Sequence, residues 1–220
     1  MLEAVELASD LYESIGVIKV GLQLFISSGT SILSIGRELG VDVFLDLKLH
    51  DIPNTVAKAV EEAAKHDVNF MTVHASGGPA MLKAAVDAAP EGMTILAVTV
   101  LTSLGPEDLE RMNVNVGHHS VVRTHVLDLA KMAWECGVRG FVCSPLEVKA
   151  LREEFGPEAV LVVPGIRPAD SANQDQKRVA TPERAVEDGA SYIVVGRPIR
   201  NAENPKKAAQ AIAESIRPFT

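Results

Sequence analysis

The chain has 220 residues, of which 47% are hydrophobic and 23% are charged, and this composition suits one large domain with a sizeable core. It excludes intrinsic disorder, a collagen-like repeat and a coiled coil as the main architecture. Twenty-one basic and 29 acidic residues give a formal net charge of −8, which argues against broad, nonspecific binding of nucleic acid.

Cysteine usage and hydropathy predict a cytoplasmic protein. Cys136 and Cys143 lie in apolar surroundings, and their number and spacing fit neither a disulfide framework nor a metal site. The apolar runs are far shorter than the roughly 20 residues that a membrane-spanning helix needs. Residues 1–16 carry acids where an export signal carries bases. We therefore expect reduced cysteines, no membrane insertion and no nucleic-acid partner.

Hydrophobic periodicity predicts helices and strands in alternation, beginning with a helix. The expected helices are 2–16, 28–39 (with Ser28 as a plausible cap), 53–66 (with Pro53 in its first turn), 79–89, 119–135, 145–155, 181–189 and 204–219. The expected strands are 17–22, 41–49, 69–75, 93–101, 140–144, 159–166 and 191–197. Strict alternation with short loops implies a parallel sheet with right-handed crossovers.

The predicted fold class is α/β, a single (β/α)₈ TIM-barrel domain over residues 1–220. The seven expected strands are one fewer than a closed barrel needs, and the shortfall lies at the N-terminus. A doubly wound sheet is the structural alternative. The even spacing of the elements favours the barrel.

Charged side chains alternate with apolar ones in the strand predicted at 41–49. One face carries only apolar residues, and the other carries Phe44, Asp46 and Lys48. The apolar face should pack under the helices, so Asp46 and Lys48 should point into the barrel near its carboxyl end. Barrel enzymes build their active sites at that end.

Inward charges need partners, because burying an unpaired charge is costly. Lys19 should face inward from the adjacent strand, and Asp51 follows Lys48 at the end of its strand. A lysine held among carboxylates is suited to donating a proton. The alternative is a structural cluster of ion pairs, in which Asp51 caps the helix that begins at Pro53.

Two strand ends predict a phosphate site. Gly165, Ile166 and Arg167 end one predicted strand, and Gly196 and Arg197 end the last. Barrel enzymes commonly hold phosphate at the loops after strands seven and eight, where glycine allows close approach and arginine supplies charge-assisted hydrogen bonds. The alternative is that the glycines serve turns and the arginines stay solvated.

A metal site is not predicted. His118, His119 and His125 lie close in sequence, but no acidic residue or cysteine has a spacing suited to completing a site with them. We expect a solvated helix start at these histidines.

A set of motifs in a fixed order carries a family resemblance. FLDLKLHDIPNTV is preceded by IKVGLQLF and followed by TVHASGG, VTVLTS, VVPGIRP, DQKRV and YIVVGRPI. Over essentially the whole chain, this order resembles the bacterial-type orotidine 5′-phosphate decarboxylase family. The resemblance implies a (β/α)₈ homodimer that converts orotidine 5′-phosphate to UMP and CO₂ in de novo pyrimidine biosynthesis, without a metal or organic cofactor.

The resemblance also implies roles for individual residues. Lys48 would protonate C6 of the pyrimidine, Asp46 would lie beside the substrate carboxylate, and Lys19 would contact the ribose and hold the charged array. Asp51 would reach into the partner subunit's site together with Ile52 and Thr55. Thr102 would contact the pyrimidine, and the phosphate would be held by Arg167, Gln176, Gly196 and Arg197.

The resemblance begins after the family's first strand, which ends in a ribose-binding aspartate. Residues 1–16 match the helix that follows that strand. We therefore expect either a natural start upstream of Met1 or a version that lacks this strand. Two alternative functions remain at this point, namely a truncated, non-catalytic phosphate or nucleotide binder and a Mg²⁺-dependent sugar-phosphate decarboxylase or aldolase of the same superfamily.

Overall fold

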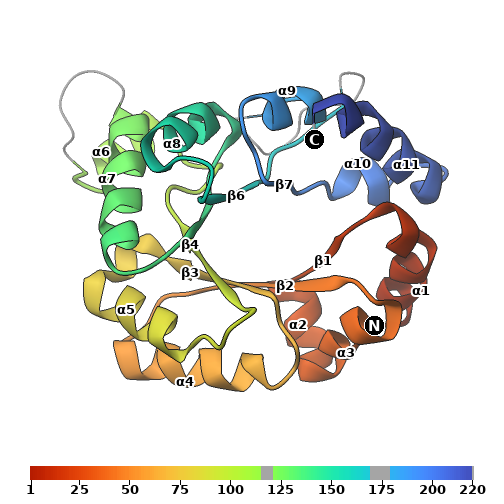
Figure 1. The fold of residues 1–220 in the computed structure, drawn as a ribbon, viewed down its shortest axis with the longest axis horizontal. Coiled ribbons are helices and arrows are strands. Elements are labelled where there is room, and N and C mark those ends of the chain that lie inside the picture. The colour runs from red at the N-terminus through yellow and green to blue at the C-terminus, as the bar shows by residue number, and fades with distance from the viewer. Residues whose placement is uncertain (115–120, 169–178, 220) are drawn as a thin grey trace.

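The computed structural model describes residues 1–114, 121–168 and 179–219. Seven parallel strands form one sheet that curls around an interior, with helices on its outside (Figure 1). The strands are β1 (Val17–Gly21), β2 (Asp42–Leu49), β3 (Phe70–His74), β4 (Thr94–Val98), β5 (Gly140–Val142), β6 (Val160–Val163) and β7 (Tyr192–Ile193).

The strand order settles the choice between the two predicted architectures. The strands pair in chain order from β1 to β7, and each neighbouring pair is parallel. A doubly wound sheet would reverse its order at a switch point, so the barrel-type prediction is confirmed. Within the described residues, the curled sheet has seven strands with β1 and β7 at its edges, as the strand count from the sequence predicted.

Eleven α-helices lie among the described residues, and none of them is long and apolar enough to cross a membrane. They are α1 (Leu2–Leu11), α2 (Leu22–Ser28), α3 (Ser34–Leu39), α4 (Pro53–Ala64), α5 (Pro79–Ala88), α6 (Pro106–Arg111), α7 (Val121–Glu135), α8 (Val148–Phe155), α9 (Pro182–Glu187), α10 (Arg197–Arg200) and α11 (Pro205–Ile216).

Two local expectations were wrong. Residues 28–39 do not form one helix capped by Ser28, because Ser28 ends α2, whose Leu24 and Phe25 pack against the core, and a 3-10 turn (Gly29–Leu33) separates it from α3. Residues 191–197 do not form one continuous strand either. The strand β7 is short, and Pro198, which has no N–H to donate to a sheet, lies in the first turn of the short helix α10.

Alternating strand residues build two apolar layers. Residues such as Val43, Leu45 and Val20 pack against the surrounding helices, as the alternation in 41–49 predicted. Residues of the opposite strand faces meet inside the curled sheet, where the buried members are Phe44, Phe70, Leu96 and Val162. This inner layer fills the interior below the carboxyl ends of the strands.

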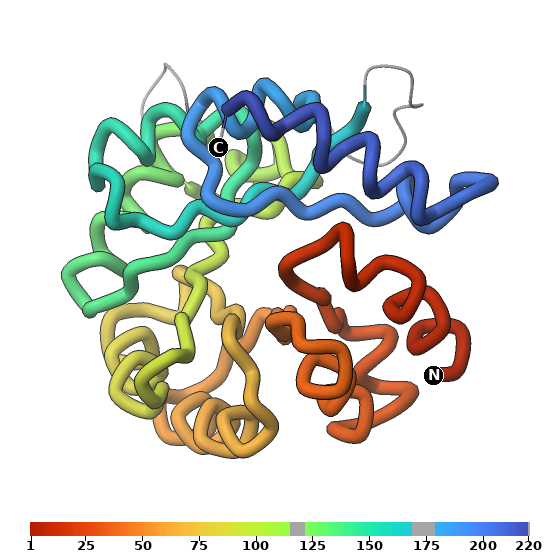
Figure 2. The backbone as a smooth tube through the Cα atoms, turned by 45° about the vertical axis from the view of Figure 1, so that its right-hand side comes forward, coloured from red at the N-terminus to blue at the C-terminus, as the bar shows by residue number. Residues whose placement is uncertain are grey.

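The first and last helices pack together across the edge of the sheet. Leu11 of α1 shares a small core with Ile199, Ala209 and Ile212 from α10 and α11. Lys206 adds an ion pair with Glu13, with Nζ 2.9 Å from the carboxylate oxygen. Figure 2 shows these terminal helices as neighbours on one side of the molecule. Helix packing thus joins the two ends of the chain on the side where β1 and β7 form sheet edges.

Gly140 of β5 provides a test of the inner packing. A Cβ atom at this buried position would lie 2.4 Å from Cδ2 of Leu96, which is itself fully buried. We expect Gly140→Ala to lower the free energy of unfolding by about 1–3 kcal/mol through overpacking. Urea denaturation measures this change. Gly16→Ala is the matched control, because nothing lies within 4 Å of its added methyl group, and equal losses in the two variants would contradict the packing described here.

Candidate active site

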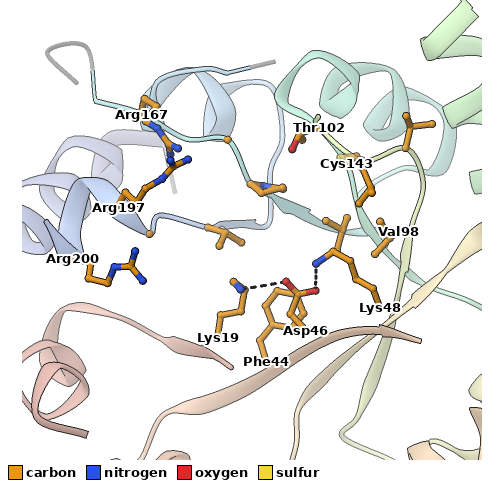
Figure 3. Close-up of a pocket in the computed structure, with 17 residues that line it drawn as sticks. Lys19, Phe44, Asp46, Lys48, Val98, Thr102, Cys143, Arg167, Arg197 and Arg200 are labelled. Carbon is orange, nitrogen blue, oxygen red and sulfur yellow. Dashed lines mark hydrogen bonds and ion pairs between the residues drawn. The ribbon is translucent and has the colours of Figure 1, made fainter. Parts of the chain in front are cut away.

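A cavity of about 550 Å³ opens at the carboxyl ends of the strands. Among the described residues, its walls come from β1, β2, β4 and β5 and from the segments that follow β4, β5, β6 and β7. Figure 3 shows its charged residues directed into this space from opposite walls. The cavity has the size of a small-molecule site and lies where barrel enzymes place their catalytic groups.

A carboxylate held between two lysines forms the floor of the cavity. Lys48 Nζ donates to Oδ1 of Asp46 at 2.6 Å, and Lys19 Nζ lies 3.3 Å from Oδ2. The Asp46 side chain is 12% exposed, whereas the side chains of Lys19 and Lys48 are 36% and 28% exposed. The acid is therefore shielded, while both ammonium groups remain open to a ligand.

Parallel pairing of β1 and β2 explains how Lys19 reaches the acid. Gly21 is the residue of β1 that lies opposite Asp46, and Lys19 lies opposite Phe44. A Cβ atom at Gly21 would lie 3.0 Å from Lys19 Nζ. The glycine thus leaves open the space that the ammonium group occupies beside the carboxylate.

The two lysines decide the ionisation state of Asp46. Burial is the largest single influence and acts to raise its pKa, but the charges of Lys19 and Lys48 and the hydrogen bonds from Lys48 and Thr72 together outweigh it. The pKa of Asp46 therefore lies below its ordinary value, and the side chain is ionised at neutral pH.

The backbone of β2 departs from regular geometry where it delivers Lys48. Lys48 adopts φ +52°, and the β2–β3 pairing shifts register between Leu45 and Leu49. A left-handed conformation costs a residue with a side chain roughly 1 kcal/mol or more. The Lys48 N–H donates to Thr72 Oγ1 at 2.9 Å, and Thr72 Oγ1 donates to Asp46 Oδ1 at 3.0 Å.

His74 lies at the end of β3, next to this array. Its ring centroid is 5.7 Å from that of His50, and the side chain is half-buried. Burial is the main cause that lowers the pKa of His74, and the nearby His50 and Lys48 lower it further. The imidazole is therefore neutral at pH 7.

The opposite wall of the cavity is cationic. Arg167, which follows β6, and Arg197, in α10, both line the cavity, and their guanidinium groups point toward the same part of it in Figure 3. Arg167 is buried and donates from Nη1 to the Ile166 carbonyl oxygen at 2.7 Å. Gly196, which precedes Arg197, lines the cavity as well, and the predicted Thr102 lines it from the segment after β4.

Charge within the cavity is opposite in sign to that of the whole chain. Among the described residues, five basic side chains and one acidic side chain line it, namely Lys19, Lys48, Arg167, Arg197, Arg200 and Asp46. The chain as a whole has a formal charge of −8. A cationic pocket in an acidic protein concentrates anionic ligands at one place.

Some predicted site residues lie elsewhere in this chain. Asp51, Ile52 and Thr55 are exposed and do not line the cavity. The Asp51 carboxylate accepts the N–H of Ile52 at 2.7 Å, and no side-chain bond caps α4, so the alternative role of Asp51 as a helix cap was wrong. Gln176 lies outside the described residues.

Part of the group formed by His118, His119 and His125 also lies outside the described residues. His118 and His119 lie outside the described residues, and His125 belongs to α7. Among the residues that are described, no group of three or more His, Cys, Asp and Glu side chains is arranged to hold a metal ion.

Sequence reasoning missed two residues that belong to this site. Thr72 shares the inward face of β3 with His74, but a threonine in a strand is too common to signal a polar contact. Arg200 follows Arg197 by three residues, a spacing that puts both on one helix face. Recognising Pro198 as a first-turn residue of a helix would have predicted that Arg200 shares a face with Arg197.

A curled parallel sheet with an ionised array at its carboxyl end is the arrangement of a TIM-barrel-like enzyme. The chain belongs to the orotidine 5′-phosphate decarboxylase / HUMPS family, whose model matches residues 1–212. Orotidine 5′-phosphate decarboxylase of Anaeromyxobacter sp. (strain K) is 50% identical over 202 residues, covering 92% of this chain and 87% of the relative. That of Moorella thermoacetica is 47% identical over 209 residues, covering 91% and 82%.

Solved structures agree with this assignment. The crystal structure of orotidine 5′-phosphate decarboxylase from Lactobacillus acidophilus superposes with a TM-score of 0.82 at 40% identity, covering 98% of this chain and 94% of that one. The enzyme from Pyrococcus horikoshii gives a TM-score of 0.78 at 26% identity, with 98% and 94% covered. The arrangement of the strands is therefore that of the family.

The lowered pKa of Asp46 predicts a pH-dependent contribution to stability. An acid whose folded pKa lies below its unfolded value, about 3.9 for aspartate, stabilises the fold above that value and loses this effect as pH falls through the folded pKa. The difference in unfolding free energy between the wild type and Asp46→Asn should be largest near pH 7 and shrink below about pH 4. Urea denaturation at several pH values measures it, and a difference independent of pH would contradict the ionised array.

Proposed function

We propose that this protein decarboxylates orotidine 5′-phosphate to UMP and CO₂ in pyrimidine biosynthesis. One observation carries the proposal, namely the Lys48 ammonium group, hydrogen-bonded to Asp46 at 2.6 Å and open to the cavity. Relatives that are 47% and 50% identical bear the name of this decarboxylase. Their names favour this activity over a Mg²⁺-dependent sugar-phosphate lyase or a non-catalytic binder.

The charge of the cavity suits this substrate. Orotidine 5′-phosphate carries a carboxylate and a phosphate, and a phosphate monoester holds about −1.5 to −2 charges at pH 7. Among the described residues of the cavity, five basic groups against one acid leave an excess of positive charge to receive it. We assign the phosphate to Arg167, Arg197, Gly196 and Gln176, and the pyrimidine to the opposite end, where Thr102 and Lys48 would contact it.

The reaction needs a cation at the carbon that loses its carboxyl group. The bond between C6 and the carboxyl carbon breaks, CO₂ leaves, and the electron pair stays on C6. A preorganised ammonium group at this position stabilises the developing negative charge. Lys48 then transfers a proton to C6, which completes UMP and leaves a neutral amine that solvent reprotonates.

Asp46 and Lys19 support this step. Asp46 would lie beside the substrate carboxylate, where the proximity of two negative charges raises the energy of the bound substrate more than that of the transition state. Lys19 would contact the ribose while it holds the second oxygen of Asp46. Binding energy from the remote phosphate would fix the pyrimidine in this position.

Removing the proton donor tests the proposal. Lys48→Ala should lose at least about a hundredfold in turnover, because the ammonium group acts mainly in the transition state, while UMP binding stays measurable. Decarboxylation is followed by the absorbance change, and UMP binding by calorimetry, with EDTA present in both. Lys65→Ala is the control, since Lys65 is an exposed lysine paired with Glu62. Near-normal turnover by Lys48→Ala would remove Lys48 from this role.

We further propose that the enzyme is a cytoplasmic homodimer with shared sites. Asp51, Ile52 and Thr55 are exposed and lie outside their own chain's cavity, which suits side chains that reach into a partner. An isologous dimer would exchange these residues reciprocally between two sites. Neither Cys136 nor Cys143 takes part in a disulfide bond among the described residues, as is usual for proteins in a reducing compartment.

Subunit mixing tests the shared site. Lys48→Ala and Asp51→Ala proteins, each inactive alone, should regain activity when mixed, because each heterodimer holds one intact site and one doubly defective site. Random re-association gives about half heterodimers and therefore roughly a quarter of wild-type activity. Sedimentation confirms that dimers form and exchange. A folded, exchanging mixture without recovered activity would show that Asp51 does not act across the interface.

A further inference from the structure

A single buried hydroxyl group joins the two functional residues of β2. Thr72 Oγ1 accepts the backbone N–H of Lys48 at 2.9 Å and donates to Asp46 Oδ1 at 3.0 Å. Thr72 itself is completely buried at 0% exposure, so water does not compete for these bonds. A hydroxyl group has one proton to donate. Because Thr72 Oγ1 accepts the Lys48 N–H, its own proton is donated to the Asp46 carboxylate.

The register of the two strands explains why a side chain is needed here. Leu45 pairs with Met71, and Leu49 pairs with Val73, so three residues of β2 lie opposite Thr72 alone. This bulge displaces the regular ladder between the strands. The hydroxyl of Thr72 takes the place of a ladder acceptor for the Lys48 N–H, which would otherwise be left without a partner at a strained backbone position.

Oδ1 of Asp46 receives two donors at once. It accepts the Thr72 hydroxyl and the Lys48 ammonium group, while Oδ2 faces Lys19. Thr72 therefore holds both the backbone from which Lys48 projects and the oxygen to which its ammonium group is bound. Loss of the hydroxyl would release both constraints together.

We propose that Thr72 is a positioning residue for the decarboxylation, which holds Lys48 in its left-handed conformation and orients Asp46 toward it. The proposal rests on the proposed function, in which Lys48 and Asp46 act on the substrate. Preorganisation of this kind matters because small displacements of catalytic groups cost large factors in rate.

Thr72→Ser and Thr72→Ala form the decisive pair of variants. Both lack the threonine methyl group, so they create similar space in the core and differ in the hydroxyl alone. We expect Thr72→Ser to keep kcat within about threefold of the wild type, and Thr72→Ala to fall about 10- to 100-fold below Thr72→Ser, with KM changed little. Thr99→Val is the control, because Thr99 is a buried threonine whose hydroxyl donates a long bond, 3.4 Å to the Val142 carbonyl oxygen.

Two readouts separate positioning from a merely structural effect. The backbone amide hydrogen of Lys48 should exchange with solvent faster in Thr72→Ala than in Thr72→Ser, because its acceptor is gone. The pKa of Asp46 should rise in Thr72→Ala, because a donor to the ionised form is lost. The carboxyl ¹³C shift of Asp46 reports this pKa at the carboxylate itself, which distinguishes it from the charged and titratable groups that face Asp46, namely Lys19, Lys48 and His74.

The outcomes distinguish this proposal from the proposed function. A wild-type protein that does not turn over orotidine 5′-phosphate would overturn the function, whereas the amide-exchange comparison would still test the contact of Thr72. Equal kcat in Thr72→Ala and Thr72→Ser would overturn the positioning role. Equal exchange at Lys48 in the two variants would overturn it as well.

Discussion

A carboxylate shielded from water between two ammonium groups is the constraint on which the functional end of this molecule depends. Asp46 is only 12% exposed, and an isolated charge at that depth would be costly. Lys19 and Lys48 each take one carboxylate oxygen, which keeps the acid ionised and leaves one net positive charge at the floor of the cavity. Removing Asp46 would leave two neighbouring ammonium groups without their shared counter-charge, whereas removing either lysine would leave the carboxylate with one cationic partner.

This constraint accounts for the irregular geometry around it. Lys48 can turn its ammonium group back to the acid two residues away because its backbone leaves the regular strand at φ +52°. Gly21 leaves room for the Lys19 ammonium group, and Thr72 satisfies the N–H that the bulge would otherwise leave unpaired. Residues of β1, β2 and β3 therefore combine in a single charged cluster.

The remaining strands supply a second site of positive charge on the facing wall. Arg167 and Arg197 follow β6 and β7, which are far from β2 in sequence. They line the same cavity because the sheet curls, and because α1 and α11 pack together beside its edges. A substrate with one anionic group at each end would be held between the two walls. The negative charge of the rest of the chain would repel such a substrate elsewhere and so favour its binding in the cationic cavity.

The sequence by itself determined the order of strands and helices, the barrel class and the inward orientation of Asp46, Lys48 and Lys19. These follow from periodicity, because a strand with one purely apolar face has only one way to pack under helices. Together with the motif order, the same residues indicated the family.

Only the tertiary structure decided the contacts that cross between strands. The partnership of Thr72 with Lys48 and Asp46 depends on a register shift between β2 and β3, and no local pattern encodes such a shift. The same holds for Arg200, which lines the cavity because β7 stops at Ile193 and the chain turns into α10, with Pro198 in the first turn of that helix. Local spacing specifies which face of an element a residue occupies, whereas the pairing of distant elements specifies what that residue touches.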